Sequence, residues 1–177
     1  MTLEDLKYPI GKYEKPDQIT EQQLKLYIAD IQDFPAKLET AVGLLTDEQL
    51  NTPYRPQGWT IRQVVHHCAD SHMNSLIRFK LALTEDKPVI KPYFEDRWAE
   101  LTDSQNYPIE PSLVLLKSLH ARWTHLLVGL NESQFERKFI HPEHGKEFSL
   151  KENTGIYAWH GKHHLAQIIS LVKRMNW

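Results

Sequence analysis

Histidine is the residue type in this sequence best suited to chemistry, because its imidazole can bind a metal or move protons near neutral pH. Three of the ten histidines fall in the stretch YAWHGKHH, residues 157–164. Successive helical residues turn by about 100°, so side chains four apart share a face. In a helix, His160 and His164 therefore form an i, i+4 pair, a spacing found in many helical metal sites, and His163 points away from them. The pair could equally be polar residues at the edge of an apolar stripe.

A third ligand would have to come from another helix, and HHCADSH at residues 66–72 is the obvious source. Helical periodicity does not choose among its three histidines. His72 falls inside the apolar stripe centred on Cys68, and we expect it to be a buried, hydrogen-bonded core residue. We expect His66 to be solvated. Surface or local hydrogen-bonding roles are expected for the remaining candidates, which are His120, His125, His141 and His144.

Four long segments have the apolar spacing and the end signals of amphipathic helices. Thr20 with Gln23, and Thr60 with Gln63, are capping boxes that start the first two segments. A proline at a first turn starts the third. The predicted helices cover residues 20–45, 61–84, 111–130 and about 153–175.

The connections between these helices also carry signals. Residues 1–19 read as an arm on the surface, and Pro35 predicts a kink or restart of the first helix near Asp33. Residues 86–110 are too long for a tight helical hairpin, so they should cross the bundle or cover a site. FIHPEHGKEF, residues 139–148, indicates a small β-hairpin. The chain is therefore predicted to be one all-α domain over residues 1–177, a four-helix bundle.

Composition excludes several classes of protein. Lys and Arg number 21 against 23 Asp and Glu, a net charge of -2, which leaves no basic excess for nucleic acid. The single cysteine, Cys68, excludes an internal disulfide and fits a reducing cytoplasm. No secretory signal is expected at the N-terminus. No apolar stretch approaches the ~18 residues of a membrane span, so we expect a soluble protein without a membrane partner.

A family resemblance adds to this reading. GWTIRQVVHHCADSH, residues 58–72, followed by WHGKHHLAQI, residues 159–168, resembles the DinB/YfiT-like superfamily of metal-dependent enzymes, and the resemblance spans nearly the whole chain. It implies that His67, His160 and His164 hold one divalent metal ion per chain, in a four-helix bundle that forms a homodimer. It also implies antiparallel second and fourth helices, which would need an axial stagger on the order of 10 Å to bring these histidines together.

Three imidazoles without a carboxylate would leave the ion its full charge and a position open to water, which is typical of catalytic sites. Zinc is the expected ion and nickel the main substitute. Such an ion lowers the pKa of bound water to about 7, and it would likewise convert a bound thiol to thiolate. Asp70, one turn beyond His67, could orient a ligand or act as a base, or could be an exposed helix charge.

Three functions fit these features. The first is hydrolysis of a small molecule by the metal site, as the family is usually described. The second is thiol S-transfer, since some members of the family resemble transferases that join a low-molecular-weight thiol such as bacillithiol to an electrophile. The third is a non-catalytic dimeric metal-binding stress module. The sequence names no substrate.

Overall fold

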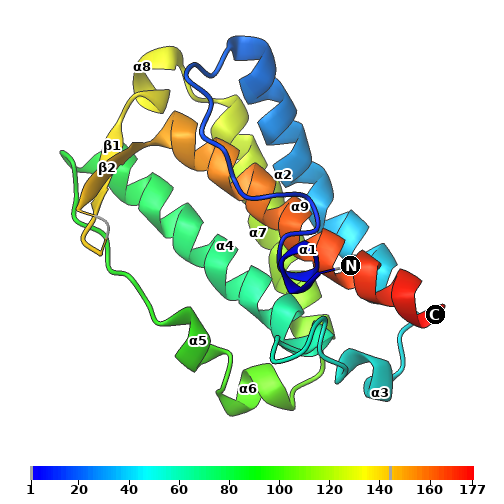
Figure 1. Cartoon of the computed structure of the whole chain (residues 1–177). Coiled ribbons are helices and arrows are strands. Elements are labelled where there is room, and N and C mark those ends of the chain that lie inside the picture. The colour runs from blue at the N-terminus through cyan, green and yellow to red at the C-terminus, as the bar shows by residue number, and fades with distance from the viewer. Residues whose placement is uncertain (1, 144) are drawn as a thin grey trace.

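Four long helices form the body of the protein (Figure 1). This computed structural model describes residues 2–143 and 145–177. Each long helix has an apolar stripe that must be buried against its neighbours, which accounts for the bundle. The long helices are α2 (Glu21–Val42), α4 (Ile61–Thr84), α7 (Glu110–Val128) and α9 (Leu150–Met175).

Side-chain pairs fix the directions of the helices. Helices α2 and α9 run parallel to each other, α4 and α7 run parallel to each other, and α4 is antiparallel to α9. The pairs are Tyr27 with Gly155 and Phe34 with Gly161 for α2 and α9, His66 with Ser112 and Phe79 with Trp123 for α4 and α7, and His67 with His160 and Ser75 with Asn153 for α4 and α9.

The long connection between α4 and α7 follows from these directions. Two parallel neighbours can be joined only if the chain returns along the length of the bundle, and residues 85–109 do so beneath α4 in the view of Figure 1. The predicted crossover is therefore confirmed. It contains two short helices that the sequence did not indicate, α5 (Glu95–Trp98) and α6 (Thr102–Gln105).

The facing pairs also give the axial offset between α4 and α9. The middle of α4 lies opposite a point about seven residues before the middle of α9, or about 10 Å along the helix axis. This is the stagger that the antiparallel arrangement requires. It brings the first third of α4 level with the middle of α9.

Several helix ends differ from the predictions. Helix α2 runs unbroken through Pro35, so the predicted restart near Asp33 was wrong, and the helix ends at Val42 rather than Leu45. Helix α9 begins at Leu150, earlier than predicted, because Ser149 and Glu152 form its capping box. Thr20 caps α2 by accepting a hydrogen bond from the Gln23 amide.

Short elements complete the chain. The predicted hairpin is present, with Phe139 opposite Phe148 in an antiparallel pair. The N-terminal arm contains a helical turn that was not predicted, begun by a capping box of Thr2 with Asp5. The short elements are α1 (Leu3–Lys7), α3 (Asp47–Leu50), α8 (Glu132–Phe135), β1 (Lys138–His141) and β2 (Lys146–Ser149).

The core has two apolar halves with a layer of histidines between them. On α4, for example, one half ends at Ala69 and the other begins at Leu76. His72 lies between these positions and is fully buried. On α7, His120 lies between Leu116 and Trp123 in the same way. The histidines thus form a polar layer across the middle of the bundle.

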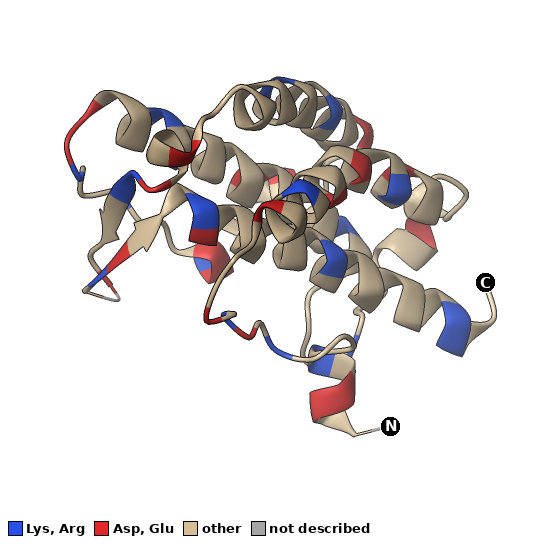
Figure 2. Ribbon diagram, turned by 90° about the horizontal axis from the view of Figure 1, so that it is seen from above, with Lys and Arg blue, Asp and Glu red and all other residues tan. Residues whose placement is uncertain are grey.

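The outer surface mixes both signs of charge. Figure 2 shows Lys and Arg interspersed with Asp and Glu along the chain, in keeping with the net charge of -2. Within the described residues, none of the helices combines the length and hydropathy that crossing a membrane requires.

Candidate metal centre

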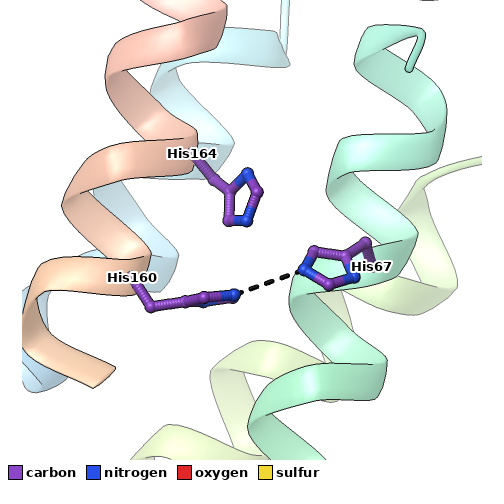
Figure 3. Close-up of side chains that lie close together, drawn as sticks. All are labelled: His67, His160 and His164. Carbon is purple, nitrogen blue, oxygen red and sulfur yellow. Dashed lines mark hydrogen bonds between the residues drawn. The ribbon is translucent and has the colours of Figure 1, made fainter. Parts of the chain in front are cut away.

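Three histidines from two helices converge at the centre of the bundle. His160 and His164, one turn apart on α9, point toward His67 on α4 (Figure 3). The Nε2 atoms of His67 and His160 are 3.2 Å apart. One ring nitrogen from each of the three residues lies within 4.8 Å of the others, so the group could hold a metal ion.

The closest pair of donor atoms has the spacing of a transition-metal site. Two imidazole nitrogens bound to tetrahedral zinc at about 2.05 Å lie roughly 3.3 Å apart, close to the separation of His67 and His160. The group contains only imidazoles among the residues that the structure describes. A ligand set of neutral nitrogen donors suits zinc, nickel, cobalt or copper.

The three imidazoles are neutral at physiological pH. Burial, followed by the nearby His163, lowers the pKa of His67 to about 4. Burial and the neighbouring imidazoles hold the pKa values of His160 and His164 well below the ordinary value of a histidine. A metal therefore meets free lone pairs and does not have to displace protons.

A chain of hydrogen bonds fixes which nitrogen of His160 is free. The Ile31 carbonyl can only accept, so His120 donates to it from Nδ1 and its Nε2 is an acceptor. His72 then donates from Nδ1 to His120 over 2.7 Å, and its own Nε2 accepts from Nδ1 of His160 over 3.0 Å. The lone pair of His160 is consequently on Nε2, the atom that faces His67. We call His160, His72, His120 and the Ile31 carbonyl the histidine relay.

A second set of hydrogen bonds acts on His164. The Gln167 amide donates from Nε2 to the carbonyl of Lys7, 3.0 Å away, which leaves its Oε1 as an acceptor. His164 donates to that oxygen from Nδ1 over 2.9 Å, so its Nε2 keeps a free lone pair. Because Lys7 belongs to α1, the N-terminal arm contributes to the order of this site.

A cavity of about 450 Å³ adjoins His160, one of the three histidines. Helices α4 and α9 form one side of it, and the hairpin and residues 92–96 of the crossover form the other. His160 is partly exposed and contributes to the wall. Ser71 and Tyr157 lie next to it, where the Tyr157 hydroxyl donates to the Ser71 carbonyl over 3.2 Å. A small molecule in this cavity would reach the candidate metal centre from the side of His160.

Comparison with known proteins agrees with this architecture. The sequence pattern of the DinB superfamily matches residues 31–168, most of the chain. The chain belongs to the DinB superfamily. Two relatives of this DinB-superfamily chain, from Bacillus cereus (strain 03BB102) and Bacillus anthracis (strain A0248), are each 54% identical over 175 residues, covering 99% of this chain and 100% of the relative. Both are named "Putative metal-dependent hydrolase".

A solved structure resembles the whole DinB-superfamily chain. YfiT from Bacillus subtilis matches with a TM-score of 0.95 and 51% sequence identity, covering 98% of this chain and 99% of the other. It is described as "a probable metal-dependent hydrolase with an unusual four-helix bundle topology". This DinB-superfamily bundle has the parallel pairs α2/α9 and α4/α7, joined through a long crossover.

The other histidines of the DinB-superfamily chain differ in part from the predictions. His72 is buried and hydrogen-bonded, as predicted. The prediction that His66 is solvated was wrong: it is buried between α4 and the crossover, where its Nε2 donates to the Tyr107 carbonyl over 3.1 Å. His163 stacks on Trp159, bonds to Gln167 and has its ring centroid 5.1 Å from that of His164, so it lies beside the group of three.

The histidines outside α4 and α9 have separate roles. His120 is buried rather than superficial, and its partners are 48 and 89 residues away in the sequence, so its hydrogen bonds are not local. His125 is exposed. His141 contributes to the cavity wall. The prediction for His144 lies outside the described residues.

Asp70 is half-buried on α4, and burial, followed by the charge of Asp103, raises its pKa to about 6. The residues that line the cavity do not include it. Gln167, Arg78 and Tyr93 are neighbours of the site or cavity that the sequence did not single out. The spacing of Gln167, three residues after His164, was the only signal that could have identified one of them.

Proposed function

We propose that this chain is a metal-dependent hydrolase of small molecules, in which His67, His160 and His164 bind one divalent ion. Zinc is the proposed ion and nickel its main alternative. The observation that carries the proposal is the convergence of three neutral imidazoles beside a cavity of about 450 Å³. The names of the Bacillus relatives and of YfiT support the same class of reaction.

When bound, the ion supplies Lewis-acid chemistry and lowers the pKa of water at a position that the protein leaves open. The protein residues create the conditions for this chemistry. Neutral ligands leave the charge of the ion undiminished, and the histidine relay and Gln167 turn Nε2 of His160 and His164 toward the shared centre. The Trp59 ring packs against His67, with ring centroids 4.7 Å apart.

Asp70 is proposed as the carboxylate that orients His67 or takes up a proton during hydrolysis. Its pKa of about 6 suits a group that changes protonation near neutral pH. An Asp70→Asn variant that keeps its metal and loses turnover would support the role. Unchanged turnover would contradict the role, and Asp70 would then be only a charged residue on the surface of α4.

The metal site is tested by elemental analysis of protein purified without a metal-affinity column. We expect about one equivalent of zinc or nickel per chain, lost in His67→Ala and His164→Ala because two imidazoles hold such ions much more weakly than three. His125→Ala, at an exposed position, is the matched control and should keep its metal. Retention of metal by either of the first two variants would contradict the ligand assignment.

The reaction is tested by comparing turnover of simple esters and amides with conjugation of a thiol to monochlorobimane. Hydrolysis that needs the metal and no thiol supports the hydrolase. Conjugation only when thiol is present would replace it with the S-transferase, and loss of metal with no change in any activity would favour a non-catalytic module. The homodimer and the cytoplasmic location stay predictions, and sedimentation of the purified protein tests the dimer.

A further inference from the structure

The cavity beside the three histidines contains a cation that the proposed hydrolysis does not use. Arg78 lies on the wall formed by α4. Its Nε atom is shielded from solvent and has no hydrogen-bond partner among the described residues. No described carboxylate lies within 4.0 Å of its guanidinium. A buried Nε–H without a partner costs free energy, which an anion that accepts from it recovers.

Arg78 and the candidate metal centre are separated along α4. Arg78 follows His67, the candidate ligand on α4, by eleven positions, about 16 Å along the helix axis. Arg78 and His160 both line the cavity. A substrate whose reacting group lies at His160 would therefore extend along the cavity toward Arg78.

Part of the wall between these two ends is apolar. Phe139 and Phe148 from the hairpin and Ile156 from α9 line the cavity along with Arg78 and His160. The two phenyl rings stack with centroids 5.8 Å apart. A hydrocarbon chain could pack against these side chains.

Acidic residues of the cavity lie at its rim. Glu95 and Asp96 on α5 and Glu143 in the hairpin turn are exposed. Arg78 is less exposed than these carboxylates and is the one Lys or Arg among the described residues that line the cavity. Its charge acts on Glu95. An anionic group would be attracted by Arg78 and repelled by the carboxylates, which favours binding with that group beside Arg78.

We propose that Arg78 is the anchor of an anion subsite, and that the substrate class is an amphipathic acid whose carboxylate or phosphate lies at the far end of the molecule from the hydrolysed group. The guanidinium offers paired donors that match either oxyanion. The identity of the reacting end rests on the proposed function, whereas the anion subsite does not depend on a metal.

The first experiment uses metal-free protein and measures binding of octanoate, octyl phosphate and octanamide by titration calorimetry. Octanoate or octyl phosphate should bind at least about tenfold more tightly than neutral octanamide, because hydrogen bonds to a charged group are the stronger kind. The preferred anion identifies the subsite as one for carboxylate or for phosphate. Arg78→Gln should remove the preference and leave octanamide unchanged, and Arg78→Lys should keep part of it.

Arg97→Gln is the matched control, since Arg97 is exposed, stacks on Phe94 of the same wall and does not line the cavity. This variant should bind the anions as the unmodified protein does. Equal binding of octanoate, octyl phosphate and octanamide, or a preference that survives Arg78→Gln, would overturn the proposal.

The second experiment tests on metal-loaded protein whether one ligand reaches both ends of the cavity. It compares dicarboxylic acid monohydroxamates of increasing chain length, beginning with suberic acid monohydroxamate, with alkanohydroxamic acids of matched chain, beginning with octanohydroxamic acid. At one chain length the carboxylate should tighten binding about tenfold or more, and Arg78→Gln should abolish the difference. Equal affinity of the matched probes at every length would contradict a substrate that spans the two ends. If octanoate binds through Arg78 but octanohydroxamic acid does not bind, the metal chemistry fails and the anion subsite stands.

Discussion

Pro35 and the histidine relay are connected at the level of single atoms. Proline has no amide hydrogen, so the Ile31 carbonyl four residues earlier loses its helical donor. The Nδ1–H of His120 donates to this carbonyl instead. An atom that would otherwise be an unpaired buried acceptor thus becomes the end of the relay that orients His160.

The relay predicts a difference between two variants at His72. In His72→Gln, the amide oxygen can accept from His160 while the amide nitrogen donates to His120, so metal affinity should stay within about tenfold. His72→Leu removes both bonds and should weaken metal binding by about 10- to 100-fold. Competition with a chelator measures both affinities.

A purely structural role of His72 would give another pattern. Both variants would then change the unfolding free energy of the metal-free protein, and neither would change the protonation of His160. Nitrogen-15 NMR reports that protonation, and we expect Nδ1–H in the unmodified protein and in His72→Gln. Equal metal affinity of His72→Leu and the unmodified protein would contradict the relay.

At the level of elements, α9 depends on small residues where it meets α2. Gly161 lies between the two candidate ligands on α9, and a Cβ atom there would be 3.0 Å from the Phe34 ring. Phe34 is itself buried against the rings of His72 and His120, so it has little room to move. The absence of a side chain at Gly161 therefore sets the distance between α9 and α2.

Gly161→Ala should destabilise the protein despite the better helix propensity of alanine. Overpacking costs about 1–3 kcal/mol, whereas the gain in propensity is at most about 1 kcal/mol. Urea unfolding of the metal-free protein measures the net loss. Lys162→Ala and Lys162→Gly, at the exposed neighbouring position, are the controls. The difference between their unfolding free energies measures the helix propensity of alanine over glycine without overpacking. If Gly161→Ala stabilises the protein by that same difference, Phe34 adapts to the added methyl group and the prediction is wrong.

The whole molecule should lose stability in mild acid because many of its histidines are buried as neutral imidazoles. Burial is the largest cause of every one of these shifts, and it lowers the pKa of His120 to about 4. Since the unfolded chain takes up protons below about pH 6.5 and the folded chain does not, stability is full above that pH and falls toward pH 4. The histidines with lowered pKa values are His66, His67, His72, His120, His160, His163 and His164.

Between pH 7.5 and pH 5, each fully buried imidazole should contribute up to about 2 kcal/mol of this loss. The raised pKa of Asp70 acts in the opposite direction, because its neutral form is favoured in the folded chain. The net expectation for metal-free protein is a loss of several kcal/mol, measured by urea unfolding at the two pH values. An unfolding free energy that does not change over this range would contradict the neutral histidine layer.

The sequence by itself determined the four long helices, the crossover, the hairpin and the i, i+4 pair of His160 and His164. These features depend on local signals, namely capping side chains, prolines and helical periodicity, and such signals act within a few residues. The resemblance in HHCADSH and WHGKHH selected His67 where periodicity on α4 could not choose among three histidines.

Only the tertiary structure decided which atoms meet between helices. Periodicity gives the direction of a side chain around its own helix axis, but not the axial offset of about 10 Å that sets His67 opposite His160. The relay through His72 and His120 and the burial of His66 also depend on residues 41 to 89 positions apart. Contacts of this kind arise from packing of the whole bundle, because no local pattern encodes which distant acceptor a buried imidazole will find.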